Sequence, residues 1–218
     1  MITILQHGPD EPAGLIEEYV KERQQPYELL MLYDGDDLPD DPPPRLVILG
    51  GQMNANDERE YPFLVPEKAL IRTAVSRGST VLGICLGAQL IAAAFHEPIS
   101  PSQRERGWQR IQGCSPAWRH LFPSTFTVFQ WHNETFNLPE GATLLAQGDD
   151  VANQAFQIRH AVGVQFHPEV TAPIISQWAR ELEVTERHRI LDTSQREYPQ
   201  NHRRCCMLMD AFLACWER

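Results

Sequence analysis

The sequence predicts an α/β fold with a mostly parallel central sheet, flanked by helices and extended by antiparallel strands. In the N-terminal half, short apolar runs alternate with helical segments, as in strand-helix-strand units. The run at 45–49, Arg-Leu-Val-Ile-Leu, is almost wholly apolar, which is typical of a central parallel strand. Short alternating segments after residue 107 favour antiparallel additions to the sheet. We expect residues 1–218 to form a single domain, since this length suits one substantial core.

The individual elements follow from apolar spacing and from turn residues. In the N-terminal half, strands are expected at 1–6, 27–32, 45–49 and 79–84, and helices at 12–23, 63–77 and 90–95. In the C-terminal half, strands are expected at 108–112, 126–131, 143–146, 152–158 and 161–166. The chain should then form a helix at 172–184, a polar segment with little periodicity at 187–204, and a terminal amphipathic helix at 205–216.

Charge and composition argue against several classes of protein. Asp and Glu outnumber Lys and Arg by 29 to 19, and the formal net charge is −10. Basic residues form no extended cluster outside 203–204, which argues against nucleic acid or an anionic membrane as a partner. The N-terminus lacks the basic start and long apolar stretch of a signal peptide, so we expect a cytoplasmic protein. Five cysteines form no CxxC pair and no metal-ligand spacing, and we expect neither a metal nor a cofactor.

The segment Gly83-Ile84-Cys85-Leu86-Gly87-Ala88-Gln89 places a cysteine between an expected strand and an expected helix. A strand-turn-helix with glycines beside the turn exposes a nucleophile, and the backbone amides of the helix N-terminus favour a thiolate. The segment therefore predicts a nucleophile elbow at Cys85. A lone cysteine in an apolar run is more commonly structural, so partners elsewhere in the chain have to decide between the two interpretations.

The segment Gly163-Val164-Gln165-Phe166-His167-Pro168-Glu169 supplies a base and an orienting group. His167 should emerge at the end of a strand, and Pro168 biases it toward extended backbone. The two-residue spacing lets His167 and Glu169 project to one side, where the carboxylate would accept the imidazole N–H. Alone, this segment is an ordinary strand-ending turn. Together with the elbow, it predicts a Cys85-His167-Glu169 triad.

Acyl transfer also requires donors for a developing oxyanion. The N–H of Leu86, just after the nucleophile, is one candidate. The N–H of Gly51 in Gly50-Gly51-Gln52-Met53 is the other, since glycine suits a backbone that must approach a substrate closely. A Gly-Gly pair also fits a simple turn, so this signal only supports the other two.

These three motifs, in this order and rough spacing, resemble the class I glutamine amidotransferase family over about residues 45–180. The resemblance is to its stand-alone branch, similar to the glutaminase domain of GMP synthase. It implies a flavodoxin-like fold and hydrolysis of the glutamine side-chain amide, with release of ammonia. Cys85 would form a γ-glutamyl thioester, His167 would carry the proton and Glu169 would orient His167. Gly51 and Leu86 match the oxyanion donors of the family.

The resemblance also implies where the substrate's amino acid end binds. Gln89 matches the elbow glutamine, which faces bound glutamine. His132, Asn133 and Glu134 match a segment that contacts the amino acid end, with Glu134 at an Asp position and Asn133 at a Gly position. The segment 105–108, Glu-Arg-Gly-Trp, is similar to a pocket-side element of the stand-alone branch.

Three functions remain open at this point. The first is a glutamine amidotransferase that serves a separate synthetase or acceptor subunit, because the sequence contains no domain that would use ammonia. The second is a stand-alone γ-glutamyl peptidase or hydrolase that acts on γ-glutamyl conjugates. The third is a non-catalytic regulatory protein that keeps the fold.

Overall fold

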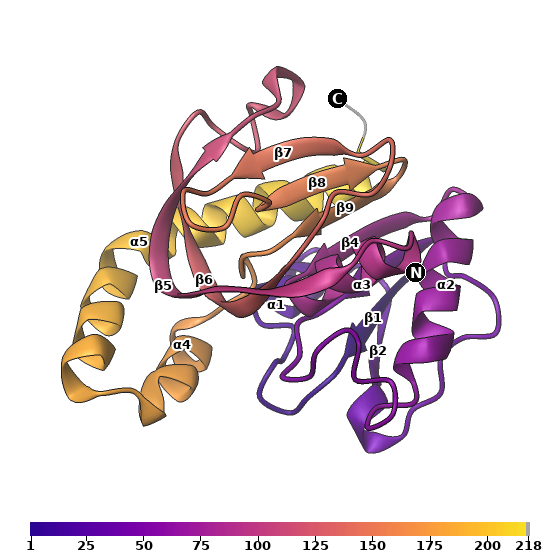
Figure 1. The fold of residues 1–218 in the computed structure, drawn as a ribbon, viewed down its shortest axis with the longest axis horizontal. Helices are drawn as coiled ribbons and strands as arrows, with labels where there is room; N and C mark the ends of the chain where they lie inside the picture. The colour runs from indigo at the N-terminus through magenta and orange to yellow at the C-terminus, as the bar shows by residue number, and fades with distance from the viewer. Residues whose placement is uncertain (217–218) are drawn as a thin grey trace.

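The computed structural model describes residues 1–216 and confirms an α/β fold built on one nine-stranded sheet (Figure 1). The strand order is β2-β1-β3-β4-β9-β8-β7-β5-β6. The strands are β1 (Ile2–Gln6), β2 (Tyr27–Met31), β3 (Arg45–Ile48), β4 (Thr80–Ile84), β5 (Ile99–Gly113), β6 (Phe126–Phe136), β7 (Thr143–Gln147), β8 (Ala155–Ile158) and β9 (Ala161–Val164). The α-helices are α1 (Leu15–Glu22), α2 (Leu64–Ser76), α3 (Leu86–Ala94), α4 (Ala172–Trp178) and α5 (Val184–Leu213).

The sheet has a parallel part and an antiparallel part. Strands β2, β1, β3, β4 and β9 pair in parallel, and β8, β7, β5 and β6 continue the sheet in antiparallel pairings. The order of the parallel strands reverses beside β1, as in flavodoxin-like folds, and their carboxyl ends meet at one edge. The loops after β1, β3, β4 and β9 therefore converge on one place.

Alternating side chains of the central strands divide the core between the two faces of the sheet. On β3, Val47 belongs to the cluster that includes residues of α1 and α5, whereas Leu46 and Ile48 belong to the cluster that includes residues of α2 and α3. Helices α1 and α5 thus contribute to the core on one face, and α2 and α3 to the core on the other. Both faces are buried, so the strand is apolar throughout.

The expected C-terminal segments are wrong in one respect, because a single helix replaces two of them. Helix α4 ends at Trp178, a 3-10 turn follows at Ala179–Glu181, and α5 then runs for 30 residues. It contains the polar segment expected at 187–204 and residues 205–213 of the helix expected at 205–216.

Polar residues at the buried positions of α5 explain this difference. Buried positions recur at helical spacing from Ile190 to Phe212, but two of them are Ser194 and Asn201. Each has a specific partner: Ser194 Oγ accepts a hydrogen bond from the Trp108 indole at 2.8 Å, and Asn201 bonds to a backbone carbonyl. These polar residues hide the apolar period that identifies a helix in sequence.

Strands β5 and β6 are also longer than the segments expected at 108–112 and 126–131. Their antiparallel pairing starts with Ile99 opposite Phe136 and ends with Ile111 opposite Phe126. The register shifts once, between Pro101 and Glu105. The added residues are largely polar and carry no alternating apolar pattern. Among residues 1–216, no helix has the length and apolar character needed to cross a membrane.

Candidate active site

Cys85 lies at the sharp turn between β4 and α3. Its backbone has φ 50° and ψ −104°, a left-handed region that costs a non-glycine residue about 1–3 kcal/mol. The turn packs closely: a Cβ at Gly87 would collide with the Ile48 carbonyl on the neighbouring strand. The structure therefore has the strand-turn-helix expected of a nucleophile elbow, and the thiol is 7% exposed at the edge where the parallel strands end.

The segment 167–169 is held by three separate elements through its backbone. The His167 N–H donates to the Phe129 carbonyl of β6 at 2.8 Å. The Pro168 carbonyl accepts from the Asn201 amide of α5 at 2.9 Å. The Glu169 carbonyl accepts from the first N–H of α1 at 2.8 Å. The long helix α5 thus supports this loop directly.

His167 and Glu169 form a buried pair. The Glu169 carboxylate lies 2.7 Å from His167 Nδ1, and both residues are at least 96% buried. Burial alone would lower the pKa of His167, but the Glu169 carboxylate and the neighbouring Cys85 together raise it well above its ordinary value. Within residues 1–216, His167 Nε2 has no hydrogen-bond partner.

Gly50 and Gln165 complete the immediate surroundings of the thiol. A Cβ at Gly50 would lie 3.1 Å from His167 Cε1 and 3.8 Å from Cys85 Cβ, so Gly50 packs against both residues. The Gln165 amide lies 3.7 Å from Cys85 Sγ and is fully buried. Gln165 belongs to the segment 163–169 but was not among the sequence candidates, because nothing in its spacing separates it from a strand residue.

The two expected oxyanion donors have no backbone acceptor in the described part of the chain. Gly51 lines the cleft beside Cys85, and Leu86 is the first residue of α3. In a trans peptide the C=O and the following N–H point in opposite directions, so the Gly50 carbonyl and the Gly51 N–H form one unit.

A second buried His-carboxylate pair holds that peptide unit. His7, at the end of β1, lies with Nδ1 3.2 Å from the Gly50 carbonyl oxygen and with Nε2 3.0 Å from Glu67 Oε1. Burial alone would lower the pKa of His7. The charge and hydrogen bond of Glu67, together with the Gly50 carbonyl, outweigh this effect, so the pKa is raised. Sequence analysis did not select His7, since a single histidine after a strand is more often structural, and Glu67 lies sixty residues away on α2.

The four residues expected near the amino acid end of the substrate differ in their surroundings. Gln89 donates to the Glu134 carbonyl at 3.2 Å and to Gln165 at 3.4 Å, so its amide joins α3 to β6. His132 and Asn133 line the cleft. His132 has both ring nitrogens engaged, with Nε2 2.9 Å from the Glu105 carboxylate.

Glu134 is half-buried at the end of β6. Burial and the neighbouring Asp57 raise the pKa of its carboxyl group. Neither Glu134 nor Gln89 is among the residues that line the cleft.

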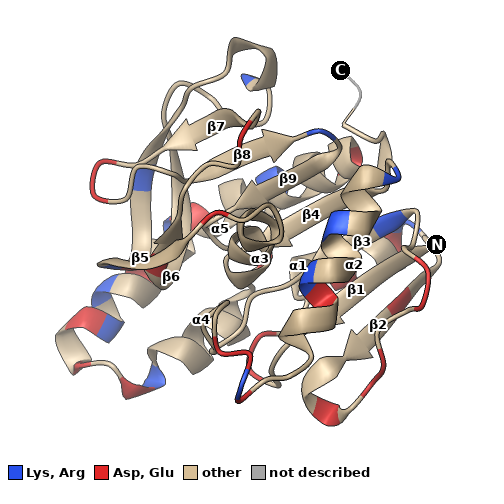
Figure 2. Ribbon diagram, turned by 45° about the vertical axis from the view of Figure 1, so that its right-hand side comes forward, with Lys and Arg blue, Asp and Glu red and all other residues tan. Residues whose placement is uncertain are grey.

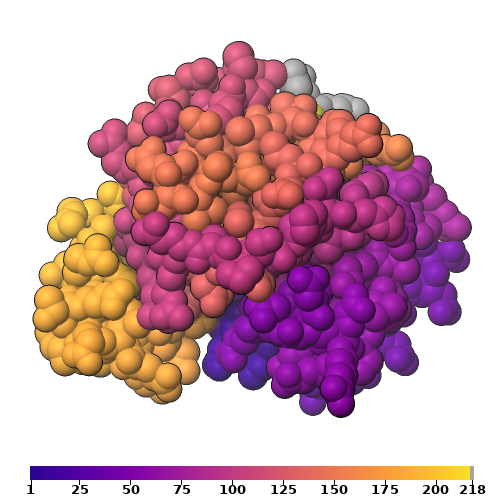
Figure 3. All heavy atoms as spheres, in the orientation of Figure 1, coloured from indigo at the N-terminus to yellow at the C-terminus, as the bar shows by residue number. Residues whose placement is uncertain are grey.

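These groups open into a cleft of about 660 Å³. Its lining residues are Asp10, Glu11, Gly51, Gln52, Cys85, Arg104, Arg106, Trp131, His132, Asn133, His167, Gln177, Trp178, Arg180, Glu181 and Leu182. Figure 3 shows the surface hollowed where the orange C-terminal segment faces the indigo and violet N-terminal half, beneath β5.

An aromatic wall that was not expected from the sequence leads away from His167. Trp178 of α4 contacts His167 edge-on, with the ring centroids 4.9 Å apart, and its indole donates to the Asp10 carbonyl at 2.7 Å. Trp131 of β6 follows, 5.8 Å from Trp178. Trp108, in the segment expected at the pocket, packs instead between β6 and α5 through Phe129 and Ser194.

The same cleft contains a carboxylate without a full set of partners. Glu11, on the loop after β1, has its Oε2 buried and unpaired within residues 1–216. Burial raises its pKa, while the Gln52 amide acts in the opposite direction. No group of three His, Cys, Asp or Glu side chains in the described part of the chain is placed to hold a metal ion.

Comparison with known proteins gives consistent results over most of the chain. The family profile for class-I glutamine amidotransferases matches residues 14–174. The glutamine amidotransferase-like protein YfeJ of Salmonella typhimurium is 32% identical over 180 residues, which cover 78% of this chain and 75% of YfeJ. The glutamine-hydrolyzing GMP synthase of Thermomicrobium roseum is 34% identical over 131 residues, 58% of this chain but only 24% of that protein.

Solved structures agree in fold along nearly the whole chain. A glutamine amidotransferase from Thermotoga maritima superposes with a TM-score of 0.89 at 31% identity, covering 97% of this chain and 96% of the other. A glutamine amidotransferase from Methylobacillus flagellatus superposes with a TM-score of 0.90 at 26% identity, covering 100% of this chain and 95% of the other. With the profile match and the similarity to YfeJ, these results establish that the chain belongs to the class I glutamine amidotransferase family.

Proposed function

We propose that this chain is a cysteine amidohydrolase that hydrolyses the side-chain amide of glutamine and releases ammonia. Cys85 is the nucleophile and His167 carries the proton. Glu169 orients His167 and stabilises its protonated form. The observation that supports this most directly is the buried His167-Glu169 pair at 2.7 Å beside an elbow cysteine in a left-handed backbone conformation. A structural cysteine needs neither feature.

The proposed reaction has two halves. Cys85 Sγ attacks the side-chain carbonyl carbon of glutamine, and the Gly51 and Leu86 N–H groups stabilise the oxyanion. The C–N bond then breaks, and the His167 imidazolium gives its proton to the departing ammonia, which leaves a γ-glutamyl thioester. In the second half, neutral His167 takes a proton from water, which attacks the thioester and releases glutamate and the Cys85 thiolate.

The raised pKa of His167 fits the resting state of this cycle. An imidazolium paired with Glu169 places a positive charge and a proton beside Cys85 before substrate arrives. The same proton is the one that the leaving ammonia requires. Glu169 therefore serves both the attack and the departure.

Ammonia released here would be used by a separate synthetase or acceptor subunit. The GMP synthases aligned to this chain extend far beyond the matched region, since the match covers about a quarter of each. Co-purification with a partner, and a rise in glutamine turnover when that partner is added, would support this part of the proposal. Turnover that no partner changes would count against it.

A hydrolase for γ-glutamyl conjugates is the second candidate. It is favoured by the cleft, which continues past His167 along Trp178 and Trp131 to several arginines. The leaving NH2 group of glutamine carries no substituent that could occupy this part of the cleft. Comparing turnover of glutamine with that of γ-glutamyl dipeptides separates the two. Efficient dipeptide cleavage without ammonia release from glutamine would replace the first candidate by the second.

Covalent labelling tests the shared chemistry of both candidates. A glutamine-analogue electrophile, followed by peptide mass mapping, should label Cys85 and none of the other four cysteines. Folded protein that remains unlabelled at Cys85 and hydrolyses no γ-glutamyl amide would indicate the third interpretation, a regulatory protein that keeps the fold.

A further inference from the structure

We propose that the outer part of the cleft is a binding site for a carboxylate carried by the leaving amine of a γ-glutamyl substrate. Arg106 and Arg180 would bind this carboxylate, with Arg104 at the rim. The inference rests on the proposed function through the Cys85 chemistry that both candidates share, and it assigns to that site the substrate class of the second candidate. It selects γ-glutamyl peptides with a free C-terminal carboxylate.

The direction of the leaving group follows from His167. The leaving nitrogen must face this imidazole to receive its proton, so any substituent on that nitrogen starts at His167. On the cleft side, the His167 ring contacts Trp178, which in turn contacts Trp131. A peptide backbone that leaves His167 therefore passes along these two indoles, which are flat and apolar enough to cover it.

The aromatic wall ends at a guanidinium group. Arg106 is the register partner of Trp131 on the neighbouring strand, and its guanidinium carbon lies 5.2 Å from the indole centroid. This stacking fixes the plane of the group and leaves its N–H donors free for a ligand. Arg180 also lines the cleft, two residues beyond Trp178.

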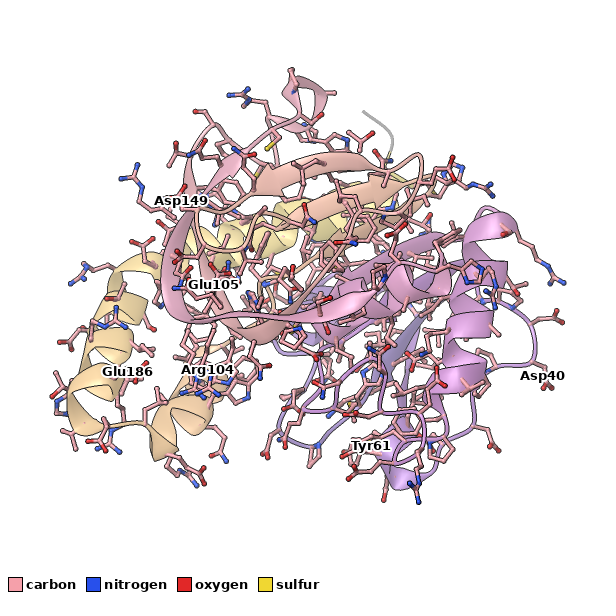
Figure 4. The ribbon with its side chains drawn as sticks, in the orientation of Figure 1. Asp40, Tyr61, Arg104, Glu105, Asp149 and Glu186 are labelled. Carbon is pink, nitrogen blue, oxygen red and sulfur yellow. The ribbon has the colours of Figure 1, made fainter. Side chains whose placement is uncertain are left out.

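Alternation along β5 places Arg104 and Arg106 on one side and Glu105 on the other. Glu105 is 2% exposed and bonded to His132 and Gln154, whereas both neighbouring arginines line the cleft. In Figure 4, the Arg104 label lies between β5 and α4, below that of Glu105. Two cationic side chains on one strand thus share the cleft with the catalytic residues.

The positive charges of the three cleft arginines are not neutralised by a carboxylate of the described chain. Among the ion pairs of residues 1–216, none includes Arg104, Arg106 or Arg180. The chain carries a net charge of −10, and Figure 2 shows acidic residues over the turns around β2 and α2. Three unpaired guanidinium groups in one cleft of an acidic protein are suited to an anion, and the fork of an arginine matches a carboxylate.

Two of the three acidic residues of the cleft come from a different segment than the arginines. Asp10 and Glu11 lie on the loop after β1. Gln52 bonds to Asp10 at 3.5 Å, and burial raises the pKa of Glu11. Only Glu181 adjoins the arginines in sequence. The aromatic wall thus has the Asp10 backbone at Trp178 and the Arg106 guanidinium at Trp131, so the basic group lies at the end that is further from His167.

Hydrolysis of one peptide in acid and amide form tests the proposal. The probes are γ-glutamyl-alanyl-glycine and the same peptide with a C-terminal amide, which differ only in the carboxylate. The wild-type protein should prefer the acid by about tenfold to a hundredfold in kcat/KM, the range for a hydrogen bond to a charged group. Arg106→Gln and Arg180→Gln should each reduce this preference. Arg110→Gln, an exposed arginine of the same strand outside the cleft lining, should leave it unchanged.

A binding measurement tests the carboxylate site without requiring turnover. Titration of the Cys85→Ser protein, followed by tryptophan fluorescence, should show tighter binding of the acid than of the amide, and Arg106→Gln in that background should abolish the difference. Equal affinity for the two peptides, or a preference unchanged in both arginine variants, would overturn the subsite.

Different results would contradict the subsite and the proposed function. If the protein hydrolyses glutamine and both peptides with no preference for the acid, the proposed function stands and the subsite is wrong. If it hydrolyses no γ-glutamyl compound, the proposed function fails, and the titration still decides whether the carboxylate binds.

Discussion

The His7-Glu67 pair offers a way to impair catalysis without touching the triad. His7 Nδ1 contacts the Gly50 carbonyl at 3.2 Å, and the same peptide unit carries the Gly51 N–H that we propose as an oxyanion donor. The change to make is His7→Leu together with Glu67→Met. Removing both members avoids leaving a buried charge unpaired, which costs about 3–5 kcal/mol, whereas apolar replacement of a buried pair is often neutral.

The expected effect has an upper limit set by the donor itself. Complete loss of one oxyanion donor lowers kcat about 10²–10³-fold. The Leu/Met variant keeps the Gly51 N–H but no longer fixes the orientation of its peptide unit. We therefore expect kcat for glutamine to fall by at least about tenfold and by no more than about 10²–10³-fold. KM should change little, because the donor acts mainly on the developing charge.

A matched control keeps the donor and removes the charge. In His7→Asn with Glu67→Gln, the Asn amide can take the place of Nδ1 and donate to the Gly50 carbonyl. This variant should retain kcat within about threefold, which corresponds to well under 1 kcal/mol. Steady-state kinetics of both variants, with urea unfolding to verify their fold, make the comparison. A Leu/Met variant that is folded and as fast as its control would refute the role of this pair.

The pair also predicts a pH dependence of stability. The pKa of His7 is raised in the folded protein above its ordinary value of 6.5. Its stabilising contribution is therefore complete below pH 6.5 and is lost as pH rises through the raised pKa. The Leu/Met variant removes this contribution, so its unfolding free energy should fall less steeply above pH 6.5, by up to about 1.4 kcal/mol per pH unit for one proton.

Three further predictions concern the triad and its supports. Glu169→Gln removes the carboxylate that raises the pKa of His167, so the alkaline limb of kcat/KM against pH should move to lower pH and kcat should fall at least about tenfold. Asn201→Ala removes the hydrogen bond to the Pro168 carbonyl and should lower the unfolding free energy in urea by about 1 kcal/mol, with a measurable loss of kcat; unchanged activity would separate α5 from the site. Gly87→Ala places a methyl group against a backbone carbonyl, so thermal unfolding should show a loss of about 1–3 kcal/mol, and a fully stable variant would contradict the packing of the elbow.

The parallel part of the fold was predictable because its signals are local. The apolar run at 45–49 and the elbow strand bury both faces, and such strands leave an uninterrupted apolar sequence. Helix α5 was not predicted as one element, because Ser194 and Asn201 occupy buried positions and Pro199 lies inside it. A proline in a helical pattern normally argues for an end or a kink.

Some residues of the candidate site were predictable from local sequence, and others were not. Cys85, His167 and Glu169 belong to short motifs, in which the chemistry and the spacing are read together. His7 and Glu67 come from segments far apart in the chain and form a contact in the fold. Trp178 and Arg106 are also far apart in the chain and line the same cleft. Their residue types are ordinary in sequence, so only the folded chain reveals them.

A trapped intermediate tests covalent catalysis by Cys85 most directly. Wild-type protein mixed with glutamine, quenched in acid within a turnover and digested, should give a γ-glutamyl adduct on the peptide that contains Cys85. The Cys85→Ser protein should give no thioester adduct and should release ammonia at a small fraction of the wild-type rate. Ammonia release by Cys85→Ser at the wild-type rate, with no adduct on the wild-type peptide, would contradict the proposed mechanism.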